Sequence, residues 1–319
     1  MCSEPVFPHS ESLSRVHSNA PEPAPDAASA GTAPRVAAVV LNWCDAEAAG
    51  ACVSALEADG YPELRIHLVD NGSPDGSGEA LRERFPHLPF LQTGRNLGYT
   101  GGNNRGIERA LDDGADYVLV LNHDTVLEPG AIRRLVRTAQ DDPEAGAVAP
   151  TVVHMDDPDH LWYDGGEFDP MRALGIHWNG NGRAPGTEGP RPVTFFTGCS
   201  VLLRAEALRE VGPFEESYFL YVEDAELSVR LARAGWRIVH EPRARVRHRT
   251  RSEEAEPTPD QIRYRDRNRR RLARAHLGPG RRAVFGAWFY PTRAVHLARY
   301  LVRGDLPRAR AILRGLSER

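Results

Sequence analysis

The sequence predicts an α/β fold, with a mainly parallel sheet flanked by helices and a helical extension at the C-terminal end. Two patterns support this prediction. Short apolar runs alternate with segments of helical periodicity from residue 35 onward, and such alternation is typical of parallel sheets. The first of these runs is continuous, as in a strand covered on both faces. We therefore expect a central sheet between layers of helices.

The first half of the chain alternates between predicted strands and helices. Residues 1–34 are rich in proline, alanine and acids, and we expect a disordered leader because they offer too little apolar surface to fold. The run VAAVVLNW then predicts a strand, and the following helix ends near Gly60, a residue type that favours helix C-caps. The predicted strands are 36–43, 64–70, 88–94 and 116–122, and the predicted helices are 45–59, 77–85 and about 103–112.

The second half is less regular. Glycine, aspartate and tryptophan dominate residues 150–192, where we expect loops or short antiparallel strands. Strands are then predicted at 195–204 and 237–242, and helices at 205–212 and 223–235. The tail is helical and basic from residue 263. We divide the ordered chain into a domain over 35–250, with halves 35–149 and 150–250, and an extension over 251–319.

Composition and charge argue against several classes of protein. The formal net charge is −4 and the chain has no lysine, which disfavours a nucleic-acid binder because duplex affinity needs a clustered basic surface. The four cysteines, Cys2, Cys44, Cys52 and Cys199, lack the spacing of a zinc site and suit a reducing compartment. There is no signal-peptide pattern and no apolar stretch long enough to span a membrane. We therefore expect a cytoplasmic protein.

The segment LVLNHDTVLEPGAI carries the strongest local signal. A buried strand runs into Asn122, His123 and Asp124, at the strand end where parallel sheets bind ligands. A carboxylate there can hold a divalent cation that also bridges substrate phosphates. In the alternative interpretation, Asp124 and Thr125 only bond backbone N–H groups of a turn. The residues alone leave both interpretations open.

Two glycine-containing segments follow other predicted strands. In LVDNGSPDGSG, Asp70 could bind a base or ribose, but a turn that caps the next helix is the better interpretation of these residues alone. GRNLGYTGGNNRG places Arg95 and Asn96 before glycines and a predicted helix start, a combination that attracts anions. Its spacing matches neither a Walker A loop nor a GxGxxG motif.

Three further candidates lie in the second half. Glu223 and Asp224 begin a predicted helix, where a carboxylate beside a cleft could act as general base towards an alcohol. The alternative is the ordinary acidic charge of a first helical turn. His248 follows a strand within VRHRT, and imidazole is a common ligand or acid–base group, but from position alone a surface histidine is the better interpretation.

Taken together and in order, these segments resemble glycosyltransferase family 2, especially its bacterial rhamnosyltransferase-like members. The resemblance runs from about residue 36 to 276 and is carried by VVLNW, VDNGS, GRNLGYTGGNNRG, LNHDT, FFTGCSVLLRAEALREVGPFEE, YFLYVED and RLARAGW. It implies the GT-A fold, which has a Rossmann-like sheet. It also implies that 35–149 is the nucleotide-sugar-binding half and that 150–250 is the acceptor and catalytic half.

The resemblance assigns metal and catalytic roles. Asp124 matches the terminal acid of the family's DXD motif, while Asn122 replaces the first acid. His248 matches a histidine that completes the metal site in some members. Asp224, preceded by Glu223, matches the acidic pair that supplies the catalytic base in inverting members.

The resemblance also assigns substrate contacts. Asp70 matches the family aspartate that contacts the nucleoside base. The other residues expected at the donor are Asn42, Asn71, Arg95, Asn96, Gly98, Asn103, Asn122 and His123. Those expected near the acceptor or the diphosphate are Trp162, Thr197, Gly198, Tyr264, Arg267 and Asn268.

The implied activity is inverting transfer of a sugar, such as rhamnose or another deoxysugar, to an acceptor hydroxyl. The donor would be a nucleotide sugar, dTDP- or UDP-linked, and the cofactor Mn²⁺ or Mg²⁺. Metal and arginine would neutralise the departing diphosphate while Asp224 accepts the proton. A glycan, a lipid-linked sugar or a small metabolite would each fit as acceptor.

Alternatives remain for the class and for the tail. A nucleotidyltransferase would want a phosphate loop with lysine, which the chain lacks. A non-catalytic sugar-nucleotide-binding or scaffold protein is suggested by Asn122, but the retention of Asp124, Asp224 and His248 together speaks against it. The basic, aromatic tail from about residue 281 either lies peripherally on the inner face of the membrane or packs Trp288 and Tyr290 onto the preceding domain.

Overall fold

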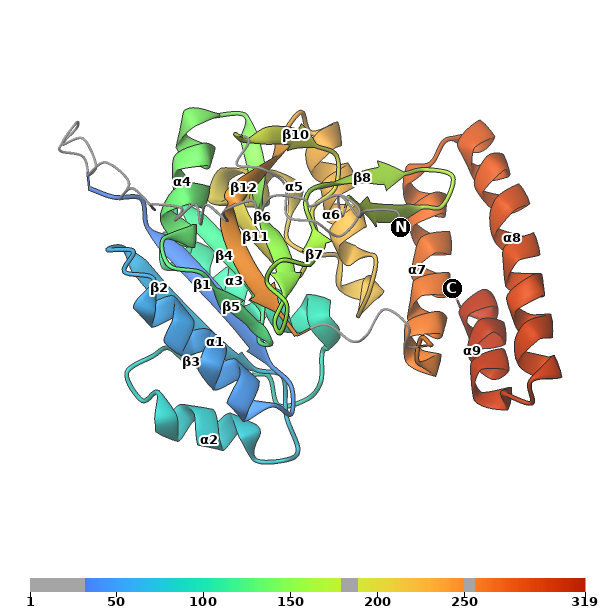
Figure 1. Cartoon of the computed structure of the whole chain (residues 1–319), viewed down its shortest axis with the longest axis horizontal. Coiled ribbons are helices and arrows are strands. Elements are labelled where there is room, and N and C mark those ends of the chain that lie inside the picture. Colours follow the sequence, from blue (N-terminus) through green and yellow to red (C-terminus); the bar gives the residue numbers. More distant parts are fainter. Residues whose placement is uncertain (1–31, 179–188, 250–255, 319) are drawn as a thin grey trace, which may run out of the picture. The chain divides into compact units, whose positions relative to one another are not determined.

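The computed structural model describes residues 32–178, 189–249 and 256–318. The leader predicted over 1–34 lies almost wholly outside the described residues. Residues from Ala33 onward form one compact unit, in which the predicted α/β sheet, its flanking helices and the helical extension are all present (Figure 1).

A mixed, mostly parallel sheet organises this unit. Its strands run in the order β10, β12, β6, β11, β4, β1, β2 and β3, with β5 paired to β12 and β7 to β6. β11 is antiparallel to both of its neighbours, whereas β4, β1, β2 and β3 are parallel. The strands before residue 160 are β1 (Val36–Asn42), β2 (Leu64–Asp70), β3 (Phe90–Gln92), β4 (Tyr117–Asn122), β5 (Thr125–Leu127) and β6 (Ala145–His154). The later strands are β7 (Leu161–Tyr163), β8 (Gly166–Asp169), β9 (Leu174–His177), β10 (Arg191–Val193), β11 (Ser200–Arg204) and β12 (Arg237–His248).

Helices cover both faces of the sheet because alternate residues of the buried strands point to opposite sides. In β1, Val36, Ala38 and Val40 pack with α1, α2 and α4. Ala37, Val39 and Leu41 face α3, α5 and α6. The helices are α1 (Ala46–Ala58), α2 (Ser77–Arg84), α3 (Gly98–Asp112), α4 (Ala131–Asp141), α5 (Ala205–Val211) and α6 (Glu223–Arg233), with a short 3₁₀ helix, η2 (Glu216–Tyr218), before α6.

Helix α3 begins at Gly98, five residues before the predicted start near residue 103. The glycines that suggested a loop instead serve close packing of the helix on the sheet. A Cβ atom on Gly102 would lie 2.6 Å from Leu41 Cδ1, and one on Gly106 would lie 2.3 Å from Val39 Cγ1. The glycine-rich segment is therefore the beginning of a helix pressed against β1.

Two strand boundaries also differ from the prediction. The strand predicted at 195–204 starts only at Ser200, and the five residues before it form a loop beside the sheet. The strand predicted at 237–242 continues to His248. An irregularity in its pairing with β6 between Glu241 and Arg245 lets it continue past Pro242. The expectation of short antiparallel strands within 150–192 is confirmed by β7 and by the β8–β9 hairpin.

The C-terminal extension consists of α7 (Pro259–His276), α8 (Pro279–Val302) and α9 (Leu306–Ser317). Thr258 and Gln261 form a capping box that starts α7. Trp288 lies under the guanidinium groups of Arg172 and Arg269, so this side chain packs on the preceding part of the chain, as one of the two interpretations of the tail expected. Tyr290 does not pack in this way, because it is 51% exposed. Within the described ranges, no helix is both long and apolar enough to cross a membrane.

Candidate active site

A cavity of about 530 Å³ lies beyond the C-terminal end of β4. Backbone hydrogen bonds bring three distant segments together there. Asn122 N donates to Cys199 O at 2.9 Å, and Arg249 N donates to Asp124 O at 3.0 Å. The predicted site residues that line the cavity are Asn122, Asp124, Trp162, Thr197, Gly198, Glu223, Asp224 and His248. The structure thus unites both acidic clusters, which are 100 residues apart in the sequence.

Asp124 and His248 form the first polar group of the cavity. His248 Nε2 lies 3.3 Å from Asp124 Oδ1, because the last residue of β12 pairs with Thr125 at the start of β5. Burial disfavours the charged form of both groups. Their mutual attraction nevertheless lowers the pKa of Asp124, and Asp124 together with Cys199 raises the pKa of His248 to about 10. Without a cation these shifts favour an imidazolium beside a carboxylate, and a cation bound by the pair would displace the proton.

These two side chains fit a divalent cation that also has ligands outside the protein. Asp124 Oδ1 and His248 Nε2 face each other across 3.3 Å in a largely buried position, so a cation between them could take both as ligands. Carboxylate oxygen and imidazole nitrogen are both accepted by Mn²⁺. The described residues contain no cluster of three His, Cys, Asp or Glu side chains that could hold a metal. Phosphate and water would have to supply the remaining ligands, as is usual for Mg²⁺ sites.

Glu223 and Asp224 form the second polar group, at the first turn of α6. Gly198 N donates to Asp224 Oδ2 at 3.1 Å, and Asp224 Oδ1 accepts from Ala225 N at 2.8 Å. Burial raises the pKa of Asp224, and burial together with the adjacent Asp224 charge raises that of Glu223 well above its usual range. Glu223 is only 6% exposed, whereas Asp224 is half-buried. Asp224 is therefore the better placed carboxylate to meet a substrate.

The segment before Asp224 is strained and is held by α7. Phe219, Tyr221 and Val222 all have positive φ angles, a conformation that costs non-glycine residues energy and often marks functional sites. Asn268 Nδ2 donates to three carbonyls of this segment, those of Tyr218, Leu220 and Tyr221, at 2.7–2.9 Å. The segment leads directly into Glu223 and Asp224, so α7 supports the turn that positions these two carboxylates.

Helix α7 lines the cavity with residues other than the three named from the resemblance. Tyr264 stacks on Phe219 with ring centroids 5.3 Å apart, and Arg267 Nη2 donates to Tyr218 O at 2.7 Å. Together with Asn268, these residues fix the strained segment and do not line the cavity. A direct ligand contact by these three stays a prediction. The α7 residues that do line the cavity are Gln261 and Arg265.

Several residues of the cavity wall were not singled out from the sequence, among them Arg249, Gln261 and Arg265. Gln261 and Arg265 are four positions apart and so share one face of α7. The exposed guanidinium of Arg265 counteracts the rise in the pKa of Asp224. A helix so rich in arginine gives no sequence signal for which arginine faces a site.

Asp70 lies outside this cavity, in a closed network at the ends of β1 and β2. Its carboxylate accepts from Asn42 Nδ2 at 2.7 Å, Ser73 Oγ at 2.6 Å and Gln92 Nε2 at 2.7 Å. Burial favours the neutral acid, but these hydrogen bonds outweigh it and lower the pKa of Asp70. Asp70 is fully buried. Its contact with a nucleoside base stays a prediction.

The other predicted donor residues organise the turn before α3. Asn71 Nδ2 donates to Asn96 Oδ1 and to Gly98 O, at 3.1 and 3.0 Å. Arg95 is exposed on the same turn. The buried Asn103 donates to Tyr99 O at 2.9 Å. His123, in the turn between β4 and β5, is absent from the described cavity wall; for all of these residues, contact with a donor stays a prediction.

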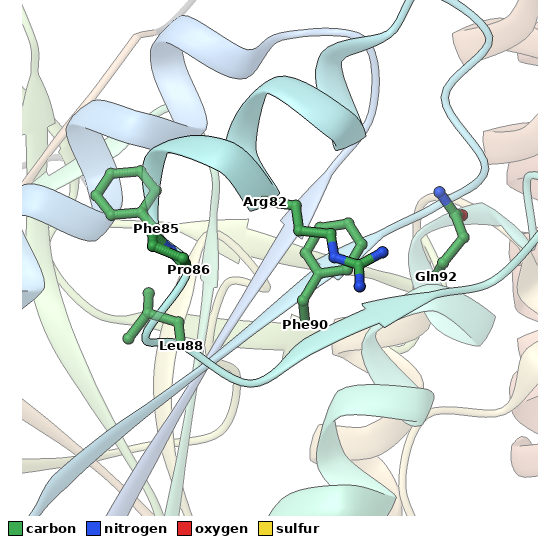
Figure 2. Close-up of a pocket in the computed structure, with 6 residues that line it drawn as sticks. All are labelled: Arg82, Phe85, Pro86, Leu88, Phe90 and Gln92. Atoms are coloured by element: carbon green, nitrogen blue, oxygen red, sulfur yellow. The ribbon is translucent and has the colours of Figure 1, made fainter.

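A second hollow, of about 550 Å³, lies at the β3 edge of the sheet and does not have the character of a catalytic site (Figure 2). Arg82 lies over the ring of Phe90 at 5.9 Å, and the other lining residues are Phe85, Pro86, Leu88 and Gln92. No acid or histidine is among them. Of these two hollows, the one at the β4 end is therefore the one that carries carboxylate and imidazole groups.

Comparison with known families identifies the chain. A family model described as "Glycosyltransferase like family 2" matches residues 34–274. The chain belongs to this family. The match contains all of the cavity residues named above, including Arg265 on α7.

Among family 2 relatives, the N-acetylglucosaminyl-diphospho-decaprenol L-rhamnosyltransferase of Mycobacterium tuberculosis is 38% identical over 209 residues, which are 58% of this chain and 66% of the relative. The chain thus spans slightly less than two thirds of that protein.

Two of the solved structures that resemble this chain show the same fold. The mannosyltransferase PcManGT of Pyrobaculum calidifontis, in complex with GDP-Man and Mn²⁺, has a TM-score of 0.56 and 19% identity and covers 89% of this chain and 80% of its own. The structure of GalNAc-T7 with UDP, GalNAc and Mn²⁺ has a TM-score of 0.57 and 16% sequence identity. The match covers 71% of this chain and 45% of GalNAc-T7.

Proposed function

We propose that this family 2 protein is an inverting glycosyltransferase that moves a sugar from a nucleotide diphosphate to an acceptor hydroxyl in a single displacement. The observation that carries the proposal is the meeting of two polar groups in one cavity, Asp124 with His248 and Glu223 with Asp224. A displacement of this kind needs charge neutralisation at the leaving group and a base near the attacking hydroxyl. The group of Asp124 and His248 can meet the first requirement, and the group of Glu223 and Asp224 can meet the second.

Asp224 is the proposed base. Its half-buried carboxylate lines the cavity, and its raised pKa strengthens it as a proton acceptor once it is ionised. Gly198 N fixes one carboxylate oxygen, which leaves that group in a defined orientation. Glu223 also lines the cavity but is only 6% exposed, so it is less well placed to accept a proton from a substrate.

Asp124 and His248 are the proposed protein ligands of a divalent cation, Mn²⁺ or Mg²⁺. When bound, the cation would supply positive charge that stabilises the departing diphosphate. Arg249 and Arg265 line the same cavity and can add charge-assisted hydrogen bonds to phosphate. With a single carboxylate in the group, cation binding should depend strongly on the nucleotide.

The mycobacterial relative is named for an L-rhamnosyl transfer to a diphospho-decaprenol-linked sugar. By analogy we propose a dTDP- or UDP-linked deoxysugar, such as rhamnose, as donor and a lipid-linked glycan as acceptor, at the cytoplasmic face of the membrane. Free glycans and small metabolites are the competing acceptors. A transfer assay with each acceptor class separates them.

Donor binding tests the proposed metal group. Isothermal titration of UDP-, dTDP- and GDP-sugars with and without Mn²⁺ should give one donor whose affinity rises with the metal. Asp124→Ala should weaken its metal-dependent binding by at least about tenfold, because a charged ligand is lost. Asp141→Ala, which removes an exposed carboxylate on α4, should bind like wild type. Absence of binding to every nucleotide sugar would contradict the proposal and favour a scaffold function.

A further inference from the structure

The outward face of α8 carries an unbroken apolar stripe. It consists of Val284, Ala287, Pro291, Val295, Ala298 and Val302, all exposed. Their spacing of three or four residues places them on one side of the helix. Val295 is 65% exposed and Val302 is 89% exposed. An uninterrupted apolar face of this length is unusual on a solvated helix.

The stripe faces away from the rest of the described chain. On the opposite side of α8, Phe285, Phe289 and Tyr300 are buried against the other elements. Arg293 of α8 binds Asp266 of α7 at 3.0 Å, which fixes the rotation of the helix. Figure 1 shows α8 as the outermost helix, with α7 and α9 on its inner side. The exposure of the stripe is therefore set by packing.

The charge around the stripe favours an anionic partner. Residues 279–318 contain eight arginines and two acids, Asp305 and Glu318, and Glu256 pairs with Arg299 and Arg303 near the end of α8. Arg281 and Arg282 are exposed in the first turn of α8, and Arg310 and Arg314 are exposed on α9. A second copy of the chain would bring the same positive charge against this surface, which disfavours self-association through it. An anionic lipid surface can bury the apolar stripe and at the same time attract the arginines around it.

We propose that the α8 stripe docks on an anionic membrane surface, with the helix lying in the plane of the headgroups. The helix is not apolar enough to cross the bilayer, but its stripe can enter the boundary between headgroups and acyl chains while the arginines bind the lipid headgroups. This surface does not depend on the proposed transferase activity. If that activity uses a lipid-linked acceptor, docking would keep the enzyme where its acceptor is.

Flotation of the full chain with vesicles tests the proposal. Wild type should float with vesicles of equimolar phosphatidylcholine and phosphatidylglycerol at low salt, and much less with phosphatidylcholine alone. Ala287→Glu with Ala298→Glu should reduce the bound fraction by at least about tenfold, since two charges enter the apolar face. The control is Ala51→Glu with Ala275→Glu, which makes the same change at exposed helical alanines outside α8. It should float nearly as wild type does.

Three results would overturn the proposal. The first is failure of wild type to float, and the second is equal flotation of the stripe variant and wild type. The third is a wild-type dimer, measured by light scattering, that the stripe variant loses, because the stripe would then bind a second copy. Circular dichroism confirms that each variant is folded. Nucleotide-sugar binding is measured without lipid, so a failure here is distinguishable from a failure of the proposed function.

Discussion

Glu223 and Asp224 are sequence neighbours with different surroundings. Glu223 is almost fully enclosed, and its Oε2 has no hydrogen-bond partner in the described part of the chain. Asp224 reaches the cavity and is oriented by Gly198 N. Burial raises the pKa of Asp224, and burial together with the adjacent Asp224 charge raises the pKa of Glu223 well above its usual range. The environment therefore separates the roles of two similar side chains.

The pH dependence of activity should report this arrangement. Asp224 must be ionised to accept a proton, so kcat/KM should rise with pH through the raised pKa of Asp224. Arg265 opposes that rise in pKa through its charge. Arg265→Gln should therefore move the acid limb of the profile to higher pH and weaken donor binding. Arg274→Gln, which alters an exposed arginine of the same helix, should leave the limb in place; an equal shift in both variants would contradict the account.

Among the elements, α7 acts chiefly as a support for the segment before α6. Asn268 is fully buried and satisfies three carbonyls of a strained turn. Its distance in sequence from that turn, about 50 residues, explains why its role could not be predicted from spacing. The resemblance placed the right helix near the site but left open which of its faces supports the turn and which lines the cavity.

Removing this support should cost stability and activity together. Asn268→Ala leaves buried carbonyls without a donor, and one such group costs about 1–3 kcal/mol. We expect the free energy of unfolding to fall by at least about 2 kcal/mol in urea titrations, and kcat to fall at temperatures where the variant is still folded. Gln140→Ala, which removes an exposed amide from α4, is the control. Unchanged stability of the Asn268 variant would contradict this prediction, because the strained segment would then not need the hydrogen bonds of Asn268.

The elements themselves were predictable where one physical signal dominated. The continuous apolar run of β1 and the cap-like ending of α1 appear where expected. The start of α3 was predicted too late because glycine, poor in helices in isolation, is required there by contact with Val39 and Leu41. The full length of β12 was hidden by Pro242, which a pairing irregularity accommodates.

For the whole molecule, alternation of strands and helices was enough to predict the sheet and its two helical layers, and family membership confirms the resemblance. Assembly of the site was only partly predictable. The carboxylates were visible as acids at strand or helix ends, but their meeting depends on β11 lying between β4 and β6 and on β12 returning beside β5. Non-local pairing of that kind has no signature in the residues that line the cavity.

The proposed glycosyl transfer depends on Asp224 as its base, and the turnover of Asp224→Asn tests this role most directly. With the donor and metal found by titration, we predict that the variant binds the donor within about threefold of wild type while its kcat falls by at least about 100-fold, the usual scale for loss of a general base. Asp141→Asn should keep wild-type values for both. A variant with nearly full kcat, or one that loses donor binding in proportion to kcat, would contradict the assignment.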